Sequence, residues 1–304
     1  MNSEFYSNHF LLEKVSEGIY AAIAKEGGGS IGNAGFVDLG YQTIVFDTFN
    51  TQQAAEDLKT MSKKITNSPI TWVINSHWHG DHIRGNQVFR NSTIISSEVT
   101  YQKMRELHPA RIKKQKEGLQ GLADYIDSLK EQLRNNNDRK LEHQISFLSE
   151  FQASLPTLEL VLPQQTFKEE KTFHGTERSA KLFTLGGGHS YSDAMLYIQE
   201  EKVIFMGDLL FVHTHPTFFD ESSPEQWRGI LKTVEELDFK IAVPGHGPVG
   251  TKNDLKELIN YIENISQIAK TSNHVDDIPL PDKYQNWSSP EIYKQNLKRL
   301  QELN

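Results

Sequence analysis

The chain has 304 residues, of which 37% are hydrophobic and 24% charged, so it can bury a sizeable core and is not a disordered chain. Its formal net charge of −8 gives it no general attraction for nucleic acid or anionic lipid, which disfavours both as partners. The absence of cysteine excludes disulfides, cysteine-ligated zinc and a thiol nucleophile.

No segment of the sequence is typical of export or of membrane insertion. Met1–Phe5 is not a basic segment followed by a long apolar run, so no secretion signal is predicted. No apolar run reaches the length of about 18 residues that a membrane-spanning helix needs. The sequence therefore predicts a cytoplasmic protein without a membrane partner.

The first part of the chain is predicted to form short strands, turns and one helix. Strands are expected at residues 18–23, 36–39, 43–47, 71–74 and 94–95. A glycine-rich loop, 27–35, separates the first two strands, and the pattern of residues 54–64 predicts a helix. This order is typical of a mixed α/β structure.

Residues 98–155 differ in character and predict a helical insertion. Apolar residues at alternating spacings of three and four form one stripe in 119–133 and another in 141–155. Three asparagines at 135–137 interrupt the pattern, so we expect an αα-hairpin. Its apolar stripes could pack on each other and on the body of the protein, roof a site, or form a homodimer contact.

The last part of the chain again alternates strands and helices. Strands are expected at residues 158–162, 181–185, 195–198, 203–206 and 241–243. Ser223 is the predicted cap of a helix that Pro224 opens and that reaches about Leu237. Further amphipathic helices are expected at residues 255–265 and 293–300.

Strands and helices thus alternate in two halves on either side of the insertion. The halves are 1–97 and 156–304, and the helical insertion between them is 98–155. We expect them to form one α/β domain over 1–304.

The most polar segment of the chain follows the strand expected at 71–74. It contains four side chains of metal-ligand type within six residues, namely His77, His79, Asp81 and His82. Loop residues two apart can turn toward one point, and imidazole is a good ligand for Zn²⁺. A single histidine is most often an ordinary surface or core residue, but this density of ligand-type side chains indicates a metal site.

Three further ligand-type residues follow later strands. His189 comes after three glycines, Asp208 ends the run that starts at Val203, and His246 lies between two glycines. In open α/β sheets, ligands bind outside the carboxyl ends of the strands. The position of each residue at such an end predicts that they share one metal centre.

The series H-x-H-x-D-H, glycine-flanked His, Gly-Asp and Gly-His resembles the motif series of the metallo-β-lactamase superfamily. It runs from about residue 33 to residue 250 and so covers most of the chain. The resemblance implies a four-layer αββα sandwich, in which two sheets lie face to face with helices outside and the metal site at one edge. The helical hairpin would be an insertion in that fold.

The resemblance also implies two zinc ions per chain, with Mn²⁺ or Fe²⁺ as alternatives. His77, His79 and His189 would hold the first ion. Asp81, His82 and His246 would hold the second, and Asp208 would bridge both. A hydroxide bridging the two ions would be the nucleophile, because coordination lowers the pKa of water from 15.7 to about 7. Asp81 would orient it and carry the proton to the leaving group.

Several further residues are predicted to surround this site. Asp47 matches an early acidic motif of the family and would orient a ligand histidine or the loop, unless it only ends a strand. Ser190 is expected to cap or support rather than to attack. Asn33 resembles a family loop residue near the site, or belongs to a plain turn. Phe211 and His215 could wall an apolar substrate pocket, or pack on the helical hairpin.

The resemblance leads us to expect a hydrolase of a small ester, lactone, thioester or related amide, whose partner is a small molecule. Classical β-lactamases of the superfamily have Cys or Ser at the position of Asp208, whereas Asp is typical of lactonases, glyoxalase II thioesterases and phosphodiesterases. One alternative is a phosphodiesterase or nuclease with a basic groove around Arg84 and residues 103–116. Others are β-lactamase-like side activity and a metal-binding protein without catalysis.

Overall fold

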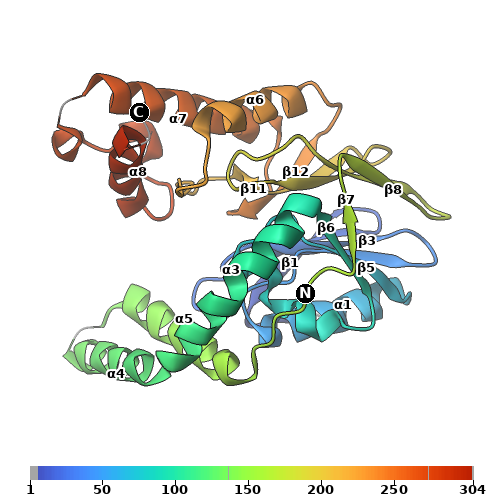
Figure 1. Cartoon of the computed structure of the whole chain (residues 1–304), viewed down its shortest axis with the longest axis horizontal. Helices are drawn as coiled ribbons and strands as arrows, with labels where there is room; N and C mark the ends of the chain where they lie inside the picture. The colour runs from blue at the N-terminus through green and yellow to red at the C-terminus, as the bar shows by residue number, and fades with distance from the viewer. Residues whose placement is uncertain (1–5, 136, 273, 303–304) are drawn as a thin grey trace. The chain divides into compact units, whose positions relative to one another are not determined.

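The structure is a computed structural model that describes residues 6–135, 137–272 and 274–302, and its chain divides into two compact units (Figure 1). The first unit contains the described residues up to Lys168 together with 174–178, and the second contains 169–173 and the described residues from Ser179 onward. Met1–Phe5, from which the absence of a secretion signal is predicted, and Asn136 of the predicted helix break lie outside the described residues.

The first unit is built on a seven-stranded mixed sheet whose strands lie in the order of the sequence. They are β1 Phe10–Ser16, β2 Ile19–Ala24, β3 Ala34–Asp38, β4 Thr43–Phe46, β5 Ile70–Ile74, β6 Thr93–Ser97 and β7 Gln165–Phe167. Strands β1 to β4 pair antiparallel, whereas β4 to β7 pair parallel. The carboxyl ends of β4 and β5 therefore meet, and the amide of Asp47 donates to the carbonyl of Ile74 at 2.8 Å.

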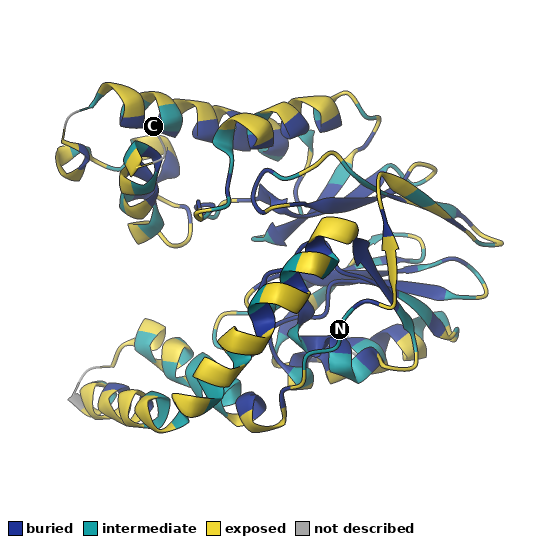
Figure 2. Ribbon diagram, viewed as in Figure 1, coloured by how far each residue is buried: buried dark blue, intermediate teal, exposed yellow. Residues whose placement is uncertain are grey.

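Besides the short 3₁₀ helix η3 Leu155–Thr157, six helical segments accompany this sheet. They are α1 Gln52–Thr66, α2 Gly80–Ile83, the 3₁₀ helix η2 Arg84–Phe89, α3 Glu98–Glu117, α4 Leu119–Asn135 and α5 Arg139–Ser154. Ala54, Ala55 and Leu58 of α1 are fully buried against the strands. The inserted segment contains the predicted hairpin, formed by α4 and α5, and in addition the long helix α3, which precedes it. Figure 2 shows that α3 and α4 are largely exposed on one side.

The prediction of a strand at 158–162 is wrong. This segment is extended but belongs to no ladder, and pairing with β6 begins only at β7. Its consecutive apolar residues pack on two different clusters: Leu160 and Leu162 contact the cluster that contains Trp78, and Val161 contacts the cluster on the α1 side of the sheet. Side-chain burial on both faces therefore produces the apolar run from which a strand was predicted.

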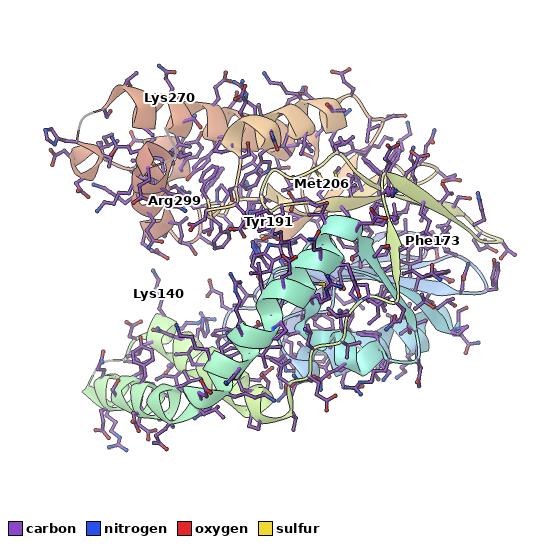
Figure 3. All side chains as sticks on the ribbon, in the orientation of Figure 1. Lys140, Phe173, Tyr191, Met206, Lys270 and Arg299 are labelled. Atoms are coloured by element: carbon purple, nitrogen blue, oxygen red, sulfur yellow. The ribbon has the colours of Figure 1, made fainter. Side chains whose placement is uncertain are left out.

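The second unit is built on a five-stranded mixed sheet in the order β12-β11-β10-β9-β8. The strands are β8 Glu170–His174, β9 Ser179–Thr184, β10 Ala194–Ile198, β11 Val203–Phe211 and β12 Ile241–His246. Three helices pack on it, namely α6 Pro224–Glu235, α7 Lys252–Thr271 and α8 Glu291–Glu302. Met206 of β11, labelled in Figure 3, is buried in the core that these helices share with the sheet. Ser223 caps α6 as predicted, since its hydroxyl accepts from the amide of Gln226.

No helix in the described parts of the chain is long and apolar enough to cross a bilayer. The cytoplasmic location stays a prediction.

His9 links helix α5 to helix α1 of the first unit. The Nε2 atom of His9 lies 3.1 Å from Glu150 Oε2 on α5, and its Nδ1 atom lies 2.8 Å from Asp57 Oδ2 on α1. Glu150 also accepts a hydrogen bond of 2.7 Å from Thr51. Although burial acts to lower the pKa of His9, the hydrogen bonds with Glu150 and Asp57 raise it above the ordinary histidine value.

This pair of contacts predicts a pH-dependent stability. The folded state binds the His9 proton more tightly than the unfolded chain does, so this stabilisation is complete below the unfolded pKa of about 6.5 and is lost as the pH rises through the folded pKa. Urea unfolding from about pH 6 to pH 9 should show the decline in the wild type and a flatter profile in His9→Gln. The exposed His274→Gln is the matched control, and equal slopes in all three proteins would contradict the prediction.

Candidate metal centre

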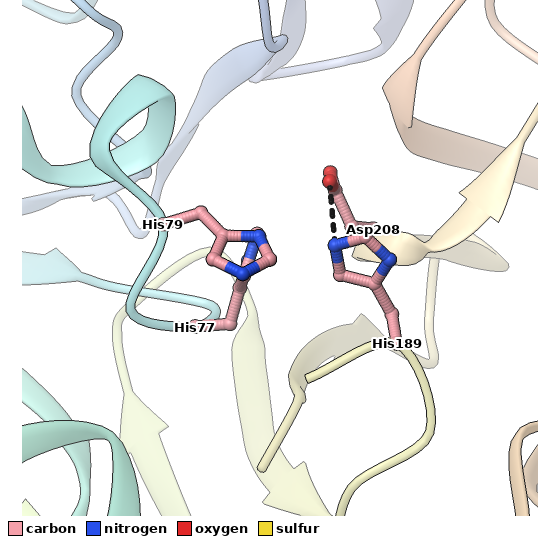
Figure 4. Close-up of side chains that lie close together, drawn as sticks. All are labelled: His77, His79, His189 and Asp208. Atoms are coloured by element: carbon pink, nitrogen blue, oxygen red, sulfur yellow. Dashed lines mark ion pairs between the residues drawn. The ribbon is translucent and has the colours of Figure 1, made fainter. Parts of the chain in front are cut away.

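The loop after β5 and the short helix α2 gather the histidines of the first unit. His77 and His82 are fully buried and His79 is nearly so. His79 is the N-cap of α2, so the chain turns into the helix directly after it, and His82 of this helix lies beside His77. The ring centroid of His77 lies 4.6 Å from that of His79 and 4.5 Å from that of His82. Figure 4 shows the His77 and His79 side chains close together.

The carboxylate of Asp47 fixes the position of this group through contacts with Ser76 and His82. It has a left-handed backbone (φ 59°), and its buried carboxylate accepts from the Ser76 amide at 2.8 Å and the Ser76 hydroxyl at 2.7 Å. His82 Nδ1 lies 2.9 Å from the same carboxylate, and Ser76 Oγ lies 2.9 Å from His77 Nδ1. Burial raises the pKa of Asp47, whereas His82 and Ser76 act to lower it. Contacts of this kind to Nδ1 orient histidines that bind a metal through Nε2.

The glycine-rich loop between β2 and β3 lies directly against His82. A Cβ atom on Gly32 would fall 2.6 Å from His82 Nε2, so only glycine allows this approach. Asn33 is buried, and its side-chain oxygen accepts from the Ala24 amide at 2.9 Å, which closes the loop. A contact between Asn33 and substrate stays a prediction.

In the second unit, one carboxylate oxygen faces two imidazoles. Asp208 Oδ2 lies 3.1 Å from His189 Nε2, the pair dashed in Figure 4, and 3.3 Å from His246 Nε2. Asp208 was expected at a strand end but lies inside β11, where Gly207 has a φ of 52° and the register with β12 shifts. A Cβ atom on Gly245 would fall 1.9 Å from Asp208 Oδ1, so the neighbouring glycine leaves room for the carboxylate.

The loop that carries His189 is organised by Asp193, a residue that was not predicted. Asp193 Oδ2 accepts from the amides of Gly188, His189 and Ser190 at 2.8, 3.0 and 3.1 Å. Its Oδ1 accepts from the Ser190 hydroxyl at 2.7 Å, so Ser190 supports the loop. Ser222, also not predicted, donates to the His189 carbonyl at 2.6 Å. The only sequence signal for Asp193 was an acidic residue four positions after a predicted ligand.

The aromatic residues after Asp208 have different surroundings. Phe211 is buried and its ring stacks on His246 at 5.0 Å. His215 is buried among aromatic rings, with Nδ1 3.0 Å from the Tyr261 hydroxyl, and burial lowers its pKa. This environment gives His215 a packing role, and its contact with substrate stays a prediction. Phe219 is 39% exposed and meets His189 edge-on at 5.6 Å.

Replacement of Asp193 should destabilise the second unit. Asp193→Ala removes a charged acceptor from four donors in a buried loop, and we expect a loss of about 3 kcal/mol in the free energy of unfolding. Urea unfolding would measure it, with the exposed Glu200→Ala as the control. Equal stabilities of the two variants would contradict the role assigned to Asp193.

The donors in each unit fit a divalent metal ion. Imidazoles and carboxylates without thiolates suit Zn²⁺, and also Mn²⁺ or Fe²⁺. The first unit offers His77, His79, Asp81 and His82, and the second offers His189, Asp208 and His246. Each set thus contains several ligand-type side chains.

Comparisons with known proteins identify the family and the fold. A curated relative, the Beta-lactamase-like protein 2 homolog of Caenorhabditis elegans, is 22% identical over 234 residues, which is 76% of this chain and 61% of the relative. Among solved structures, a metallo-beta-lactamase from Pontibacter korlensis is 17% identical with a TM-score of 0.59, and covers 84% of this chain and 100% of its own. The structure of TMB-1 is 17% identical with a TM-score of 0.58, and the match covers 86% of this chain and 100% of TMB-1.

These structures confirm the predicted αββα fold class. The family model described as the Metallo-beta-lactamase superfamily matches residues 27–246, a range that includes every predicted metal ligand. The chain therefore belongs to the metallo-β-lactamase superfamily.

Proposed function

We propose that this chain is a metal-dependent hydrolase that cleaves a small ester, lactone, thioester or related amide. Members of its superfamily are generally hydrolases. The ligands of the two units are proposed to hold two zinc ions between them, with Mn²⁺ or Fe²⁺ as alternatives. His77, His79 and His189 are assigned to the first ion. Asp81, His82 and His246 are assigned to the second, with Asp208 between the two.

The placement of Asp208 is the observation that carries this proposal. A carboxylate whose oxygen lies 3.1 and 3.3 Å from the Nε2 atoms of two histidines is suited to contact two ions. Cys or Ser, found here in classical β-lactamases of the superfamily, offers a single donor atom. The Asp therefore supports the ligand set typical of lactonases, thioesterases and phosphodiesterases rather than that of an antibiotic-hydrolysing enzyme.

The bound ions would make water nucleophilic near neutral pH and polarise the substrate carbonyl. We assign the proton transfer to Asp81. Its side chain is 22% exposed, and its Oδ2 atom lies 3.5 Å from His82 Nε2. A carboxylate that is partly open to solvent can take a proton from the attacking water and release it to the leaving group.

The surroundings of the ligands in the second unit favour an acyl substrate. Phe211 stacks on His246, and the partly exposed Phe219 meets His189 edge-on. The exposed part of the Phe219 ring offers an apolar contact beside the proposed ligands, which suits a hydrocarbon chain. The net charge of −8 is also unfavourable for a polyanionic substrate.

Substrate turnover with and without EDTA tests the proposal. The zinc-loaded protein is assayed with an N-acyl homoserine lactone, a glutathione thioester, a chromogenic β-lactam and bis-p-nitrophenyl phosphate. We expect EDTA-sensitive turnover of the lactone or thioester to exceed that of the others by at least about tenfold. Asp208→Ala should lower kcat/KM by at least about 100-fold, whereas Glu200→Ala should not.

Dominant phosphodiester turnover would replace the acyl hydrolase with a phosphodiesterase. No turnover of any of these substrates by the metal-loaded protein would contradict the proposed substrate class.

Removal of the Phe219 ring should weaken binding of long acyl chains. We expect Phe219→Ala to raise KM about tenfold for a long-chain substrate and to leave kcat within about twofold, because the apolar contact is made equally in the ground and transition states. Phe219→Leu, which retains apolar surface, should change KM less. An equal rise in KM for short and long acyl chains would contradict the assignment of Phe219 to the acyl chain.

A further inference from the structure

One face of α3 lies against the segment that carries the metal ligands of the first unit. The residues of this face are Met104, His108, Arg111 and Gln115. Their spacing of four, three and four residues places them in one stripe along the helix. Figure 1 shows α3 as the long turquoise helix that precedes α4 and α5. We refer to these four residues as the α3 stripe.

His108 binds the backbone between two ligand histidines. Its Nε2 atom lies 2.6 Å from the carbonyl oxygen of Trp78, the residue between His77 and His79. A carbonyl oxygen can only accept, so Nε2 carries the hydrogen. The contact is buried, and a buried carbonyl outside a β-ladder needs such a donor.

The side chain of Trp78 is held by the same face. Its indole packs in a buried cluster with Met104 and Ile83, and the guanidinium of Arg111 lies over the ring, 4.2 Å from the ring centroid. Trp78 is 1% exposed. Because both its carbonyl and its ring are held by α3, the peptide from which the two flanking imidazoles project has little freedom.

The far end of the ligand segment is tied to α3 through Arg84. Gln115 Oε1 accepts from Arg84 Nη2 at 3.0 Å, and Asn50 accepts from Nη1 at 2.7 Å. The guanidinium also lies 4.9 Å from the ring centroid of Phe151 on α5. A Cβ atom on Gly80 would fall 2.9 Å from Arg84 Nε, so the guanidinium lies directly against α2.

We infer that the α3 stripe positions the metal ligands of segment 77–84, so that the affinity of the site for metal depends on the inserted helices. The four residues are positioning residues, since they contact the ligand segment and are not themselves among the assigned ligands. The inference rests on the proposed metal site and assigns a role to α3 within it.

Zinc affinity, measured by competition with a chromophoric chelator, tests this inference. We expect His108→Ala to weaken zinc binding by at least about tenfold, as for other residues that orient ligands. His108→Gln, whose side-chain N–H can still donate to the Trp78 carbonyl, should restore affinity to within about threefold of wild type. Lys113→Ala changes an exposed residue of the same helix and should leave affinity unchanged.

The Co²⁺-loaded proteins provide a spectroscopic readout that is independent of activity. The visible absorption bands of His108→Ala should differ from those of the wild type, and those of His108→Gln should return toward it, because the bands report ligand geometry. Thermal unfolding of the metal-free proteins identifies a folding defect. If His108→Ala does not fold, Gln115→Ala decides the question, and we expect it to lose at least about threefold in zinc affinity. Gln115→Glu, which keeps an acceptor for Arg84, should lose less, and unchanged affinity in Gln115→Ala would then overturn the inference.

The measurements distinguish a failure of the proposed metal site from a failure of the inference about α3. A wild type that binds no zinc would overturn the proposed metal site and this inference together. Unchanged affinity and unchanged cobalt bands in folded His108→Ala, beside a zinc-binding wild type, would overturn the inference alone. An equal loss in Lys113→Ala would also overturn it, because the effect would then come from the helix in general.

Discussion

Buried carboxylates must be compensated by hydrogen bonds or by cations, and three such aspartates organise the candidate site. Asp47 accepts from Ser76 and faces His82 Nδ1. Asp193 accepts hydrogen bonds from backbone amides of the loop that carries His189. Each of these two contributes to the position of a histidine, and the local folds around β4, β5 and β9 provide the partners that their charges require.

Asp208 is the third of these carboxylates, and it differs from the other two. Its Oδ2 atom faces two imidazole Nε2 atoms rather than backbone amides. Such an arrangement suits bound cations better than a hydrogen-bonded structural role. The glycines beside it, Gly207 and Gly245, provide the bulge and the space that bring a buried carboxylate to this position.

The ligand candidates could be predicted from the sequence because their residue types are rare at such density and each lies close to a strand end. Asp193 could not, since it acts through backbone amides that leave no residue pattern. Helix α3 lacks a clear signal because its buried residues, Thr100, Met104 and His108, do not form an apolar stripe. The apolar run at 158–162 predicted a strand because an extended segment buried on two faces and a buried strand have the same residue pattern.

Sequence proximity to Asp208 does not define the surroundings of His215. It lies seven residues after Asp208, yet the chain carries it into an aromatic cluster with Tyr261 and Trp287. Phe219, four residues further on, is partly exposed beside His189. Whether a residue near a ligand in sequence faces the ligand depends on the path of the loop, which residue types alone do not define.

The inserted helices have more than one kind of contact with the body of the first unit. Helix α5 is attached by the Glu150 pair with His9, and α3 by its contacts with Trp78 and Arg84. In this unit these contacts favour a packed support for the ligand segment over a freely moving lid. Placing a metal-ligand loop on such a support reduces the freedom that must be lost when the metal binds.

The proposed function depends on two metal ions that share Asp208 as a ligand. Anomalous diffraction at the zinc absorption edge, from crystals of the zinc-loaded protein, tests it most directly. We expect two peaks, one contacted by His77, His79 and His189 and the other by Asp81, His82 and His246, with Asp208 in contact with both. A single peak, or peaks that Asp208 does not contact, would contradict it.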